Sequence, residues 1–260
     1  LLKMAEPILH HRNPMFEEIV AEVREDLKWL FGTKNEVLFF ASSGTGAMEG
    51  AVTNMLSPND KAIVVRSGKF CDRWANICKA YGIQTVEINV PWGDEIDPAL
   101  VEKALKENPD TKAVYTHATE TSTGVRYPVR EIATIVKNYP NTICVIDGIT
   151  GVGVFELPMD EWGIDILVAG SQKAFMLPPG LAFAGVSDKA WAMNKTSKMP
   201  RFYFNWTKEL TNLQKNQTNF TPAISLIVGL RESLRMMKEE GLEKIYKRAE
   251  ILARATREGA

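Results

Sequence analysis

Short apolar runs alternate with helix-like segments along most of the chain, and this alternation limits the possible folds more than any other feature. Strands are expected at residues 37–41, 62–65, 84–90, 113–116, 142–147 and 164–169. Helical segments are expected at 44–55, 71–81, 98–107 and 129–138. Mostly continuous β-branched strands separated by helices are typical of a mostly parallel sheet that is covered on both faces. The sequence therefore predicts an α/β three-layer sandwich.

The segments that flank this region are less regular. Helical spacing of apolar residues runs from residue 15 to 30, a further strand is expected at 181–186, and residues 195–220 are polar and aromatic. A helical pattern then begins near Pro222 and continues through Gly241 to the end without a cap. Because the chain also starts at Leu1 rather than at methionine, we expect a fragment whose final helix leads into a missing part.

The composition excludes several classes of protein. The 31 basic and 32 acidic residues leave a net charge of −1, so there is no electrostatic basis for binding nucleic acid or an anionic membrane. No apolar run approaches the roughly 20 residues of a membrane span, and the N-terminus does not resemble a signal peptide. The three cysteines include no CxxC pair. They favour a reducing compartment, and we expect a cytoplasmic protein.

A glycine-rich turn, SSGTGA at residues 42–47, joins an expected buried strand to a helix. In an open α/β sheet, free N–H groups and the helix dipole at such a turn attract an anion, and glycines let a phosphate approach. The alternative is a tight turn with a helix cap. A dinucleotide site is disfavoured, because the spacing is GxGxxxG and Arg66, rather than an acid, follows the next strand.

Two ionisable residues lie at the same edge of the sheet as this turn. Asp147 ends the strand at 142–147, and Lys173 follows the strand at 164–169. A partly desolvated lysine can attack an aldehyde, and a carboxylate can keep a pyridine nitrogen protonated. With the phosphate-binding turn they make a site suited to pyridoxal 5'-phosphate. Each residue by itself also has a simpler interpretation. Asp147 suits a turn or a helix cap, and Lys173 suits a solvated loop.

The segment GSQKA at 170–174, followed by PPG at 178–180, resembles the lysine segment of fold-type I, class V pyridoxal phosphate aminotransferases. The similarity includes SSGTGAM at 42–48, TH at 116–117, ETSTG at 120–124, VID at 145–147, TP at 221–222 and GLRESL at 229–234. Within the family, the chain is similar to the alanine/serine–glyoxylate (serine–pyruvate) aminotransferases. The resemblance implies an N-terminal segment and helix at 1–30, a cofactor-binding large domain at 31–235, and a helix at 236–260 that leads to an absent C-terminal domain.

The resemblance also implies the residues of the site. Lys173 would form a Schiff base with the cofactor, and Asp147 would pair with the pyridine nitrogen. The other cofactor-binding residues would be Ser43, Gly44, Thr45, Phe70, Thr121, Ser122, Gln172, Asn219 and Thr221. Of these, Asn219 and Thr221 would reach the phosphate of the other subunit, which implies a homodimer with shared sites.

Several of these roles have alternatives. Phe70 falls where the family often has a tryptophan that stacks on the pyridine ring, but it also suits an ordinary core position. Thr121 and Ser122 are interchangeable, because the segment at 117–120 is one residue longer than the family's His-Gly-Glu. Thr221 also suits a cap of the following helix.

Other residues carry weaker signals. His117 suits either a position near the ring or a structural role. The pair at 10–11, both histidines, has no acidic or cysteine partner at ligand spacing, so a metal site is disfavoured. The aromatic residues at 202–206 suit the core or a dimer interface.

The implied activity is transamination between a small amino acid (serine or alanine) and a 2-oxo acid (glyoxylate or pyruvate). The family's arginine for the substrate carboxylate belongs to the C-terminal domain, and no arginine here matches it. One alternative is a catalytically incompetent subunit or scaffold that kept the fold. A desulfurase or lyase is disfavoured, because a desulfurase needs a cysteine in a mobile loop, whereas Cys71, Cys78 and Cys144 suit packing positions.

Overall fold

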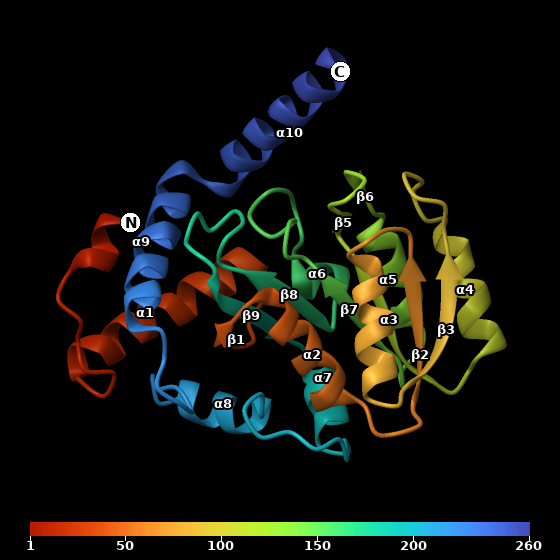
Figure 1. Cartoon of the computed structure of the whole chain (residues 1–260), viewed down its shortest axis with the longest axis horizontal. Coiled ribbons are helices and arrows are strands. Elements are labelled where there is room, and N and C mark those ends of the chain that lie inside the picture. The colour runs from red at the N-terminus through yellow and green to blue at the C-terminus, as the bar shows by residue number, and fades with distance from the viewer.

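A seven-stranded sheet forms the centre of the molecule, as Figure 1 shows for the computed structural model, which describes residues 1–260. Its strands are β1 (Val37–Ser42), β2 (Lys61–Arg66), β3 (Gln84–Asn89), β4 (Thr111–His117), β7 (Ile143–Asp147), β8 (Ile166–Gly170) and β9 (Gly180–Val186). They follow the order β1-β9-β8-β7-β4-β2-β3. A separate two-stranded sheet consists of β5 (Thr119–Glu120) and β6 (Val125–Arg126).

Six of the seven strands run in the same direction. The pairs β2–β3, β2–β4, β4–β7 and β7–β8 are parallel, whereas β9 is antiparallel to both of its neighbours, β8 and β1. Because β9 is antiparallel to both of its neighbours, β1 and β8 point in the same direction. The carboxyl ends of β1, β4, β7 and β8 therefore meet at one edge of a mostly parallel sheet, which confirms the predicted fold class.

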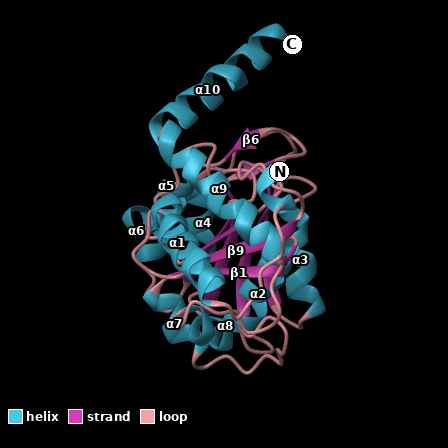
Figure 2. Cartoon of the chain, turned by 90° about the vertical axis from the view of Figure 1, so that its left-hand side faces the viewer, coloured by secondary structure: helices cyan, strands magenta, loops and turns pink.

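Helices cover both faces of the sheet. They are η1 (Leu2–Ala5), α1 (Pro14–Phe31), α2 (Gly44–Met55), α3 (Cys71–Ala80), α4 (Pro98–Glu107), α5 (Val129–Lys137), α6 (Met159–Trp162), α7 (Asp188–Asn194), α8 (Trp206–Leu213), α9 (Ile224–Glu240) and α10 (Leu242–Gly259). Figure 2 shows α1, α4, α5 and α6 on one side of the strands and α2 and α3 on the other. This is the predicted three-layer arrangement.

The core consists of strands that are buried on both faces. All five residues of β7 are buried, as are all five of β8. Phe183 of β9 stacks on Phe175, with ring centroids 4.5 Å apart, and neither side chain is exposed beyond 1%. Burial on both faces explains why these strands are apolar without alternation.

The C-terminal part differs from the expected pattern in two ways. Two short helices, α7 and α8, occupy segments for which no helix was expected; Ser187 Oγ and Asn205 Oδ1 accept hydrogen bonds from their first-turn N–H groups. The expected continuous helix after Pro222 was also wrong. It is divided into α9 and α10 at Gly241, whose φ of +82° is incompatible with a continuous helix. No helix is both long and apolar enough to cross a membrane.

Candidate active site

A cavity of about 230 Å³ opens at the edge of the sheet where the parallel strands end. Eight of the residues suggested by the sequence line it: Ser43, Gly44, Thr45, Phe70, Thr121, Asp147, Gln172 and Lys173. Five further residues complete its wall: Arg73, His117, Thr119, Ile149 and Thr150. As expected from the ends of the parallel strands, the structure brings together residues that are up to 130 positions apart in the chain.

The glycine-rich turn connects β1 to α2 at one end of this cavity. Ser43 is the N-cap residue of α2, but its side chain makes no capping hydrogen bond. The first N–H groups of a helix have no partner within it, so they are available to a ligand. Gly44 lets the side chain of Ile149 pack closely here, because a Cβ at this position would lie 2.5 Å from Ile149 Cδ1. The turn is therefore narrow, carries partial positive charge and is open to an anion.

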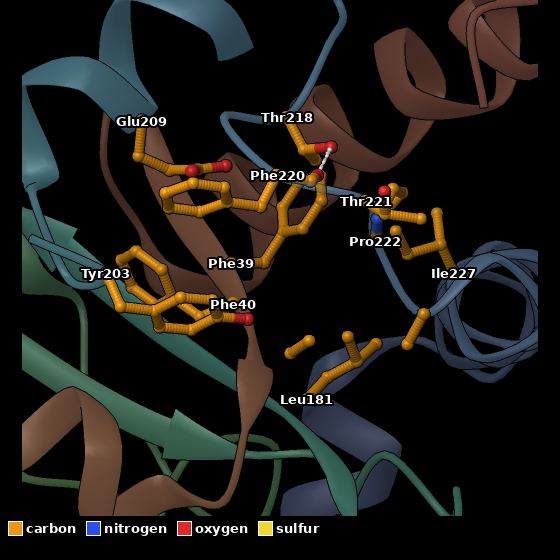
Figure 3. A pocket seen from close by; sticks show the side chains of 12 residues that line it. Phe39, Phe40, Leu181, Tyr203, Glu209, Thr218, Phe220, Thr221, Pro222 and Ile227 are labelled. Carbon is orange, nitrogen blue, oxygen red and sulfur yellow. Dashed lines mark hydrogen bonds between the residues drawn. The ribbon is translucent and has the colours of Figure 1, made fainter.

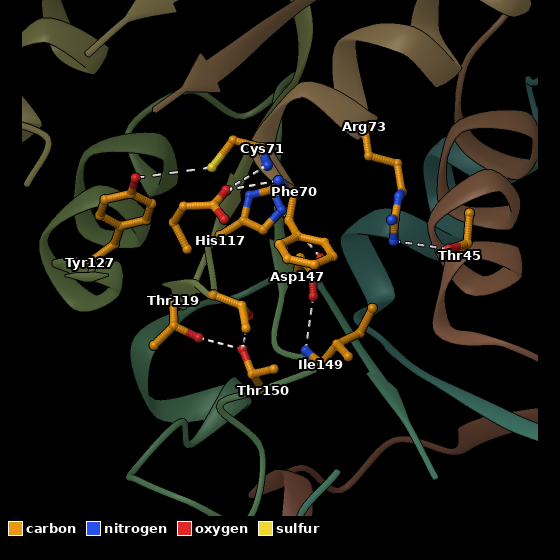
Figure 4. A network of polar contacts seen from close by, with 12 residues as sticks. Thr45, Phe70, Cys71, Arg73, His117, Thr119, Tyr127, Asp147, Ile149 and Thr150 are labelled. Atoms are coloured by element: carbon orange, nitrogen blue, oxygen red, sulfur yellow. Dashed lines mark hydrogen bonds and ion pairs between the residues drawn. The ribbon is translucent and has the colours of Figure 1, made fainter. Parts of the chain in front are cut away.

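Asp147 at the end of β7 is buried and has a partner for each carboxylate oxygen. Its Oδ1 accepts a hydrogen bond from the backbone N–H of Ile149 (2.8 Å), and its Oδ2 lies 3.2 Å from His117 Nε2. Figure 4 shows these side chains together. The bond to Ile149 makes Asp147 a turn residue as well as a cavity residue, and its pairing with a pyridine nitrogen stays a prediction.

His117, at the end of β4, is completely enclosed. Burial alone would lower the pKa of His117, but the charge of Asp147 and contacts with Asp147 and Cys71 together raise it to about 10. The indole of Trp74 meets the imidazole edge-on, with centroids 6.5 Å apart. The raised pKa favours the protonated imidazole, whose Nε2 faces Asp147 across 3.2 Å at the edge of the cavity.

Lys173 lies in a turn after β8 and is exposed. The expectation that this lysine would be partly desolvated was wrong, because its side chain leaves the sheet edge and faces the open cavity. The turn itself is fixed by Ser171, whose Oγ donates to Pro178 O (2.8 Å) and accepts from Leu181 N (3.1 Å). The neighbouring Gln172 has a buried Oε1 without a hydrogen-bond partner.

Three threonine hydroxyls form a connected group on another wall. Thr150 Oγ1 lies 2.5 Å from Thr119 Oγ1 and 3.1 Å from Thr121 Oγ1. Ser122 does not line the cavity, because its hydroxyl donates to Glu120 Oε1 (2.7 Å). Of the two interchangeable hydroxyls, Thr121 is thus the one at the cavity.

Phe70 is held in place by Glu120. The carboxylate Oε2 accepts hydrogen bonds from the backbone N–H groups of Phe70 (3.0 Å) and Cys71 (2.8 Å), at the start of α3. Burial would raise the pKa of Glu120, but hydrogen bonds from Ser122 and Cys71 lower it below its ordinary value. A charged Glu120 therefore joins the turn that carries Phe70 to the turn that carries Thr121.

Arg73 is the ionisable residue at the cavity that the sequence interpretation missed. It lies one helical turn after Phe70, so the i, i+3 spacing places both on one face of α3. Its Nη1 donates to Thr45 Oγ1 (3.0 Å), as Figure 4 shows. The helical spacing from Phe70 was a signal that could have identified it.

Asn219 and Thr221 do not reach this cavity. Thr221 lines a separate small pocket with Phe220, Tyr203 and Glu209 (Figure 3). The alternative role of Thr221 as a helix cap was wrong, because the N-cap of α9 is Ala223. Their predicted contact with the other subunit therefore stays a prediction.

Glu209 of α8 belongs to the same pocket and is a buried acid. It accepts a hydrogen bond from the backbone N–H of Asn219 (3.2 Å) and has no positively charged partner within 4 Å. Burial raises the pKa of Glu209 to about 7, and the hydrogen bond from Asn219 offsets only part of that rise. The carboxyl group thus titrates near neutral pH.

The other candidates have simple structural roles. Cys71, Cys78 and Cys144 are buried and form no disulfide. No group of three or more His, Cys, Asp and Glu residues is arranged to hold a metal ion. Trp206 is buried in the core, whereas the aromatic rings of Phe202 and Tyr203 are exposed.

Comparisons with known proteins identify the family. The model of the family "Aminotransferase class-V" matches residues 5–259. The chain is 42% identical over 260 residues to the small subunit of a soluble hydrogenase from Synechococcus sp., covering 99% of this chain and 67% of that protein. It is 35% identical over 256 residues to L-aspartate–glyoxylate aminotransferase from Paracoccus denitrificans, covering 96% and 64%.

The solved structures agree with the sequence comparisons. Alanine–glyoxylate aminotransferase from Nostoc sp. superposes with a TM-score of 0.90 at 25% identity, covering 95% of this chain and 66% of that one. The chain spans about two thirds of the length of these relatives. By its sequence and its fold, the chain belongs to the class-V aminotransferases, whose cofactor is pyridoxal phosphate.

Proposed function

We propose that this chain binds pyridoxal phosphate through Lys173 and Asp147 and transfers an amino group from serine or alanine to glyoxylate or pyruvate. The observation that carries the proposal is the single cavity that both side chains line together with the glycine-rich turn. Two of the relatives named above use glyoxylate according to their names, and their amino donors differ. Glyoxylate as the amino acceptor therefore has more support than either of the proposed amino donors, serine and alanine.

The residues of the cavity fit this cofactor. Its volume of about 230 Å³ exceeds the roughly 150 Å³ of an apolar cavity that takes up benzene, so an aromatic ring can enter. The turn before α2 offers N–H groups and the hydroxyls of Ser43 and Thr45 to a phosphate. Asp147 offers a carboxylate to a ring nitrogen, and the buried Gln172 Oε1, which has no partner in the chain, is free to accept from a donor group of a ligand.

When bound, pyridoxal phosphate supplies an aldehyde for the amine of the lysine or substrate and a cationic ring that withdraws electrons from the substrate α-carbon. Lys173 Nζ would hold the group in the resting protein. With an amino acid bound there instead, Nζ would take the proton from the substrate α-carbon as a base and give it, as an acid, to the aldehyde carbon of the cofactor. Asp147 would keep the ring nitrogen protonated, and His117 Nε2 lies 3.2 Å from Oδ2 of the Asp147 carboxylate.

The test is the visible absorption spectrum of the purified chain with pyridoxal phosphate. The wild type should develop a yellow band, and Lys173→Ala should abolish it. Lys69→Ala is the matched control, because Lys69 is exposed beside Phe70 but does not line the cavity. A band that survives in Lys173→Ala, or one that never forms in folded wild-type protein, would contradict the proposal.

The substrates are tested on the same sample. Serine and alanine should bleach the band in a single half-reaction, and glyoxylate or pyruvate should restore it. L-Aspartate is included because it is the donor in the name of one relative. If aspartate alone bleaches the band, the proposed donors are wrong while the cofactor assignment stands.

A second candidate is a non-catalytic subunit that kept the fold. The relative with 42% identity is named as a hydrogenase subunit rather than as an aminotransferase, and this name favours the alternative. The half-reaction distinguishes the two, because a non-catalytic subunit leaves the band unchanged with every amino donor.

The desulfurase alternative has less support. Cys71 and Cys78 lie in α3 and Cys144 lies in β7, and all three are buried. Burial raises the pKa of Cys78 to about 12 and that of Cys144 even further. A buried thiol that stays protonated is a poor nucleophile, so Cys78 and Cys144 do not suit sulfur transfer, and Cys71 is buried in α3 rather than placed in a mobile loop.

The proposal includes a homodimer in which Asn219 and Thr221 reach the cofactor phosphate of the other subunit. The exposed rings of Phe202 and Tyr203, beside the Thr221 pocket, support a contact surface there. Sedimentation should give twice the chain mass of 29.0 kDa. A monomer at micromolar concentration would refute this part of the proposal.

A further inference from the structure

Arg73 is a charged residue at the candidate cofactor cavity that has no partner of opposite charge. Its side chain is half-buried, and no carboxylate lies within 4 Å of it, although seventeen such ion pairs occur elsewhere in the chain. Asp147 is the single carboxylate that lines the cavity, and its Oδ2 already faces His117. Arg73 and Lys173 are thus the cationic side chains of the cavity without a carboxylate within 4 Å, and Arg73 is the one that contacts the first turn of α2.

Two contacts hold this guanidinium at one end of the cavity. Nη1 donates to Thr45 Oγ1 (3.0 Å), in the first turn of α2, and Cζ lies 5.2 Å from the centre of the Phe70 ring. Figure 4 shows Arg73 next to Thr45, on the side of Phe70 away from Thr119 and Thr150. The position is therefore fixed by contacts with residues of the cavity wall itself.

The charges of the cavity are consequently separated. At one end, the guanidinium lies beside the N-terminus of α2, where the helix dipole adds further positive charge. At the other end, Asp147 supplies negative charge. Since a guanidinium has five donor N–H groups and one is used by Thr45, donors remain for an anion.

We propose that Arg73 binds the phosphate of the cofactor and makes the site select phosphorylated over unphosphorylated pyridoxal. The inference depends on the proposed function, because it takes this cavity to be the pyridoxal phosphate site. A molecule with an anionic phosphate at one end and a protonated ring nitrogen at the other matches the separated charges. Arg73 is thus a specificity-determining residue, and Phe70 and Thr45 orient it.

The test compares the dissociation constants of pyridoxal phosphate and of pyridoxal, measured from the visible band of the wild-type and variant proteins. Arg73→Gln should weaken binding of pyridoxal phosphate by about 10- to 100-fold, the range for loss of a charge-assisted hydrogen bond, and leave pyridoxal within about threefold. Arg73→Lys keeps the charge and should recover most of the loss. Lys79→Gln removes a charge from an exposed position of the same helix and should change neither constant.

Each outcome decides between distinct conclusions. If Arg73→Gln lowers both affinities equally, Arg73 only supports Phe70, and the inference is wrong. The inference is equally wrong if Arg73→Gln changes neither dissociation constant, because the ratio of the two constants again stays the same. If wild-type protein forms no Lys173-dependent band with either compound, the proposed function itself fails and the inference fails with it.

Discussion

The buried carboxyl group of Glu209 makes the stability of this protein depend on pH in a way that can be calculated. Its pKa is about 7 in the folded chain, against 4.5 for the free group. Below pH 4.5 the Glu209 carboxyl group is mainly protonated in the folded and in the unfolded chain, so it does not lower the free energy of unfolding. As the pH rises to about 7, the unfolded chain loses the proton while the folded chain keeps it, so the native state loses stability.

The magnitude follows from the size of the shift. At about 1.4 kcal/mol for each pKa unit, a rise from 4.5 to about 7 corresponds to about 3 kcal/mol. This is a large part of the roughly 5–15 kcal/mol by which a typical domain is stable. Glu209→Gln removes the titration but keeps an oxygen that can accept the hydrogen bond from Asn219 N.

The assay is urea unfolding followed by circular dichroism at pH 5, 6, 7 and 8. The stability of Glu209→Gln relative to wild type should increase by about 2.5 kcal/mol from pH 5 to pH 8, because part of the full effect is already present at pH 5. Any cost of the new amide group is independent of pH and does not affect the slope. Glu18→Gln serves as the control, because Glu18 is exposed on α1 and has no ion pair.

A constant difference between Glu209→Gln and wild type across this pH range would refute the reasoning. It would mean that Glu209 titrates in the folded chain as it does in water. A slope of the opposite sign would mean that an unrecognised cation stabilises the carboxylate.

Two further predictions concern the site and the core. The pair of His117 with Asp147 stabilises the folded chain below pH 6.5, and this contribution is lost as the pH rises toward about 10. Urea unfolding should therefore show a larger loss for His117→Gln at pH 7 than at pH 10, and equal losses would contradict the pairing. Phe183→Ala should cost about 3–5 kcal/mol, because Phe183 is fully buried against Phe175, and Phe183→Leu should cost less. A loss below about 1 kcal/mol for the alanine variant would show that the core repacks.

The strands and long helices could be predicted because their patterns span several turns or a complete buried run. The predicted helix at 98–107 has the bounds of α4, and Asp97 caps it by accepting a hydrogen bond from Ala99 N (2.9 Å). Helices α7 and α8 were missed because seven or eight residues give only two turns of periodicity. The sequence pattern did not predict the break at Gly241. The apolar residues before and after it continue nearly the same helix face, and a positive φ cannot be recognised from the sequence.

The candidate site could be predicted only where strand ends position it. Asp147 and the glycine-rich turn follow directly from the parallel sheet. The exposure of Lys173 depends on the path of a turn beyond β8, and the place of Arg73 depends on how α3 is rotated against the sheet. The path of that turn is a consequence of tertiary packing, which no local pattern in the sequence records, whereas the i, i+3 spacing from Phe70 could have indicated Arg73.

The break between α9 and α10 at Gly241 sets the direction in which the last helix leaves the sheet. The first turn of α10 is anchored, since Ile245 is buried, while the later turns are exposed and extend away from the sheet in Figure 1. Its 18 residues span about 27 Å, so a rotation of about 10° at Gly241 moves the far end by about 5 Å. The backbone angles of one glycine thus determine the direction of the whole last helix relative to the sheet.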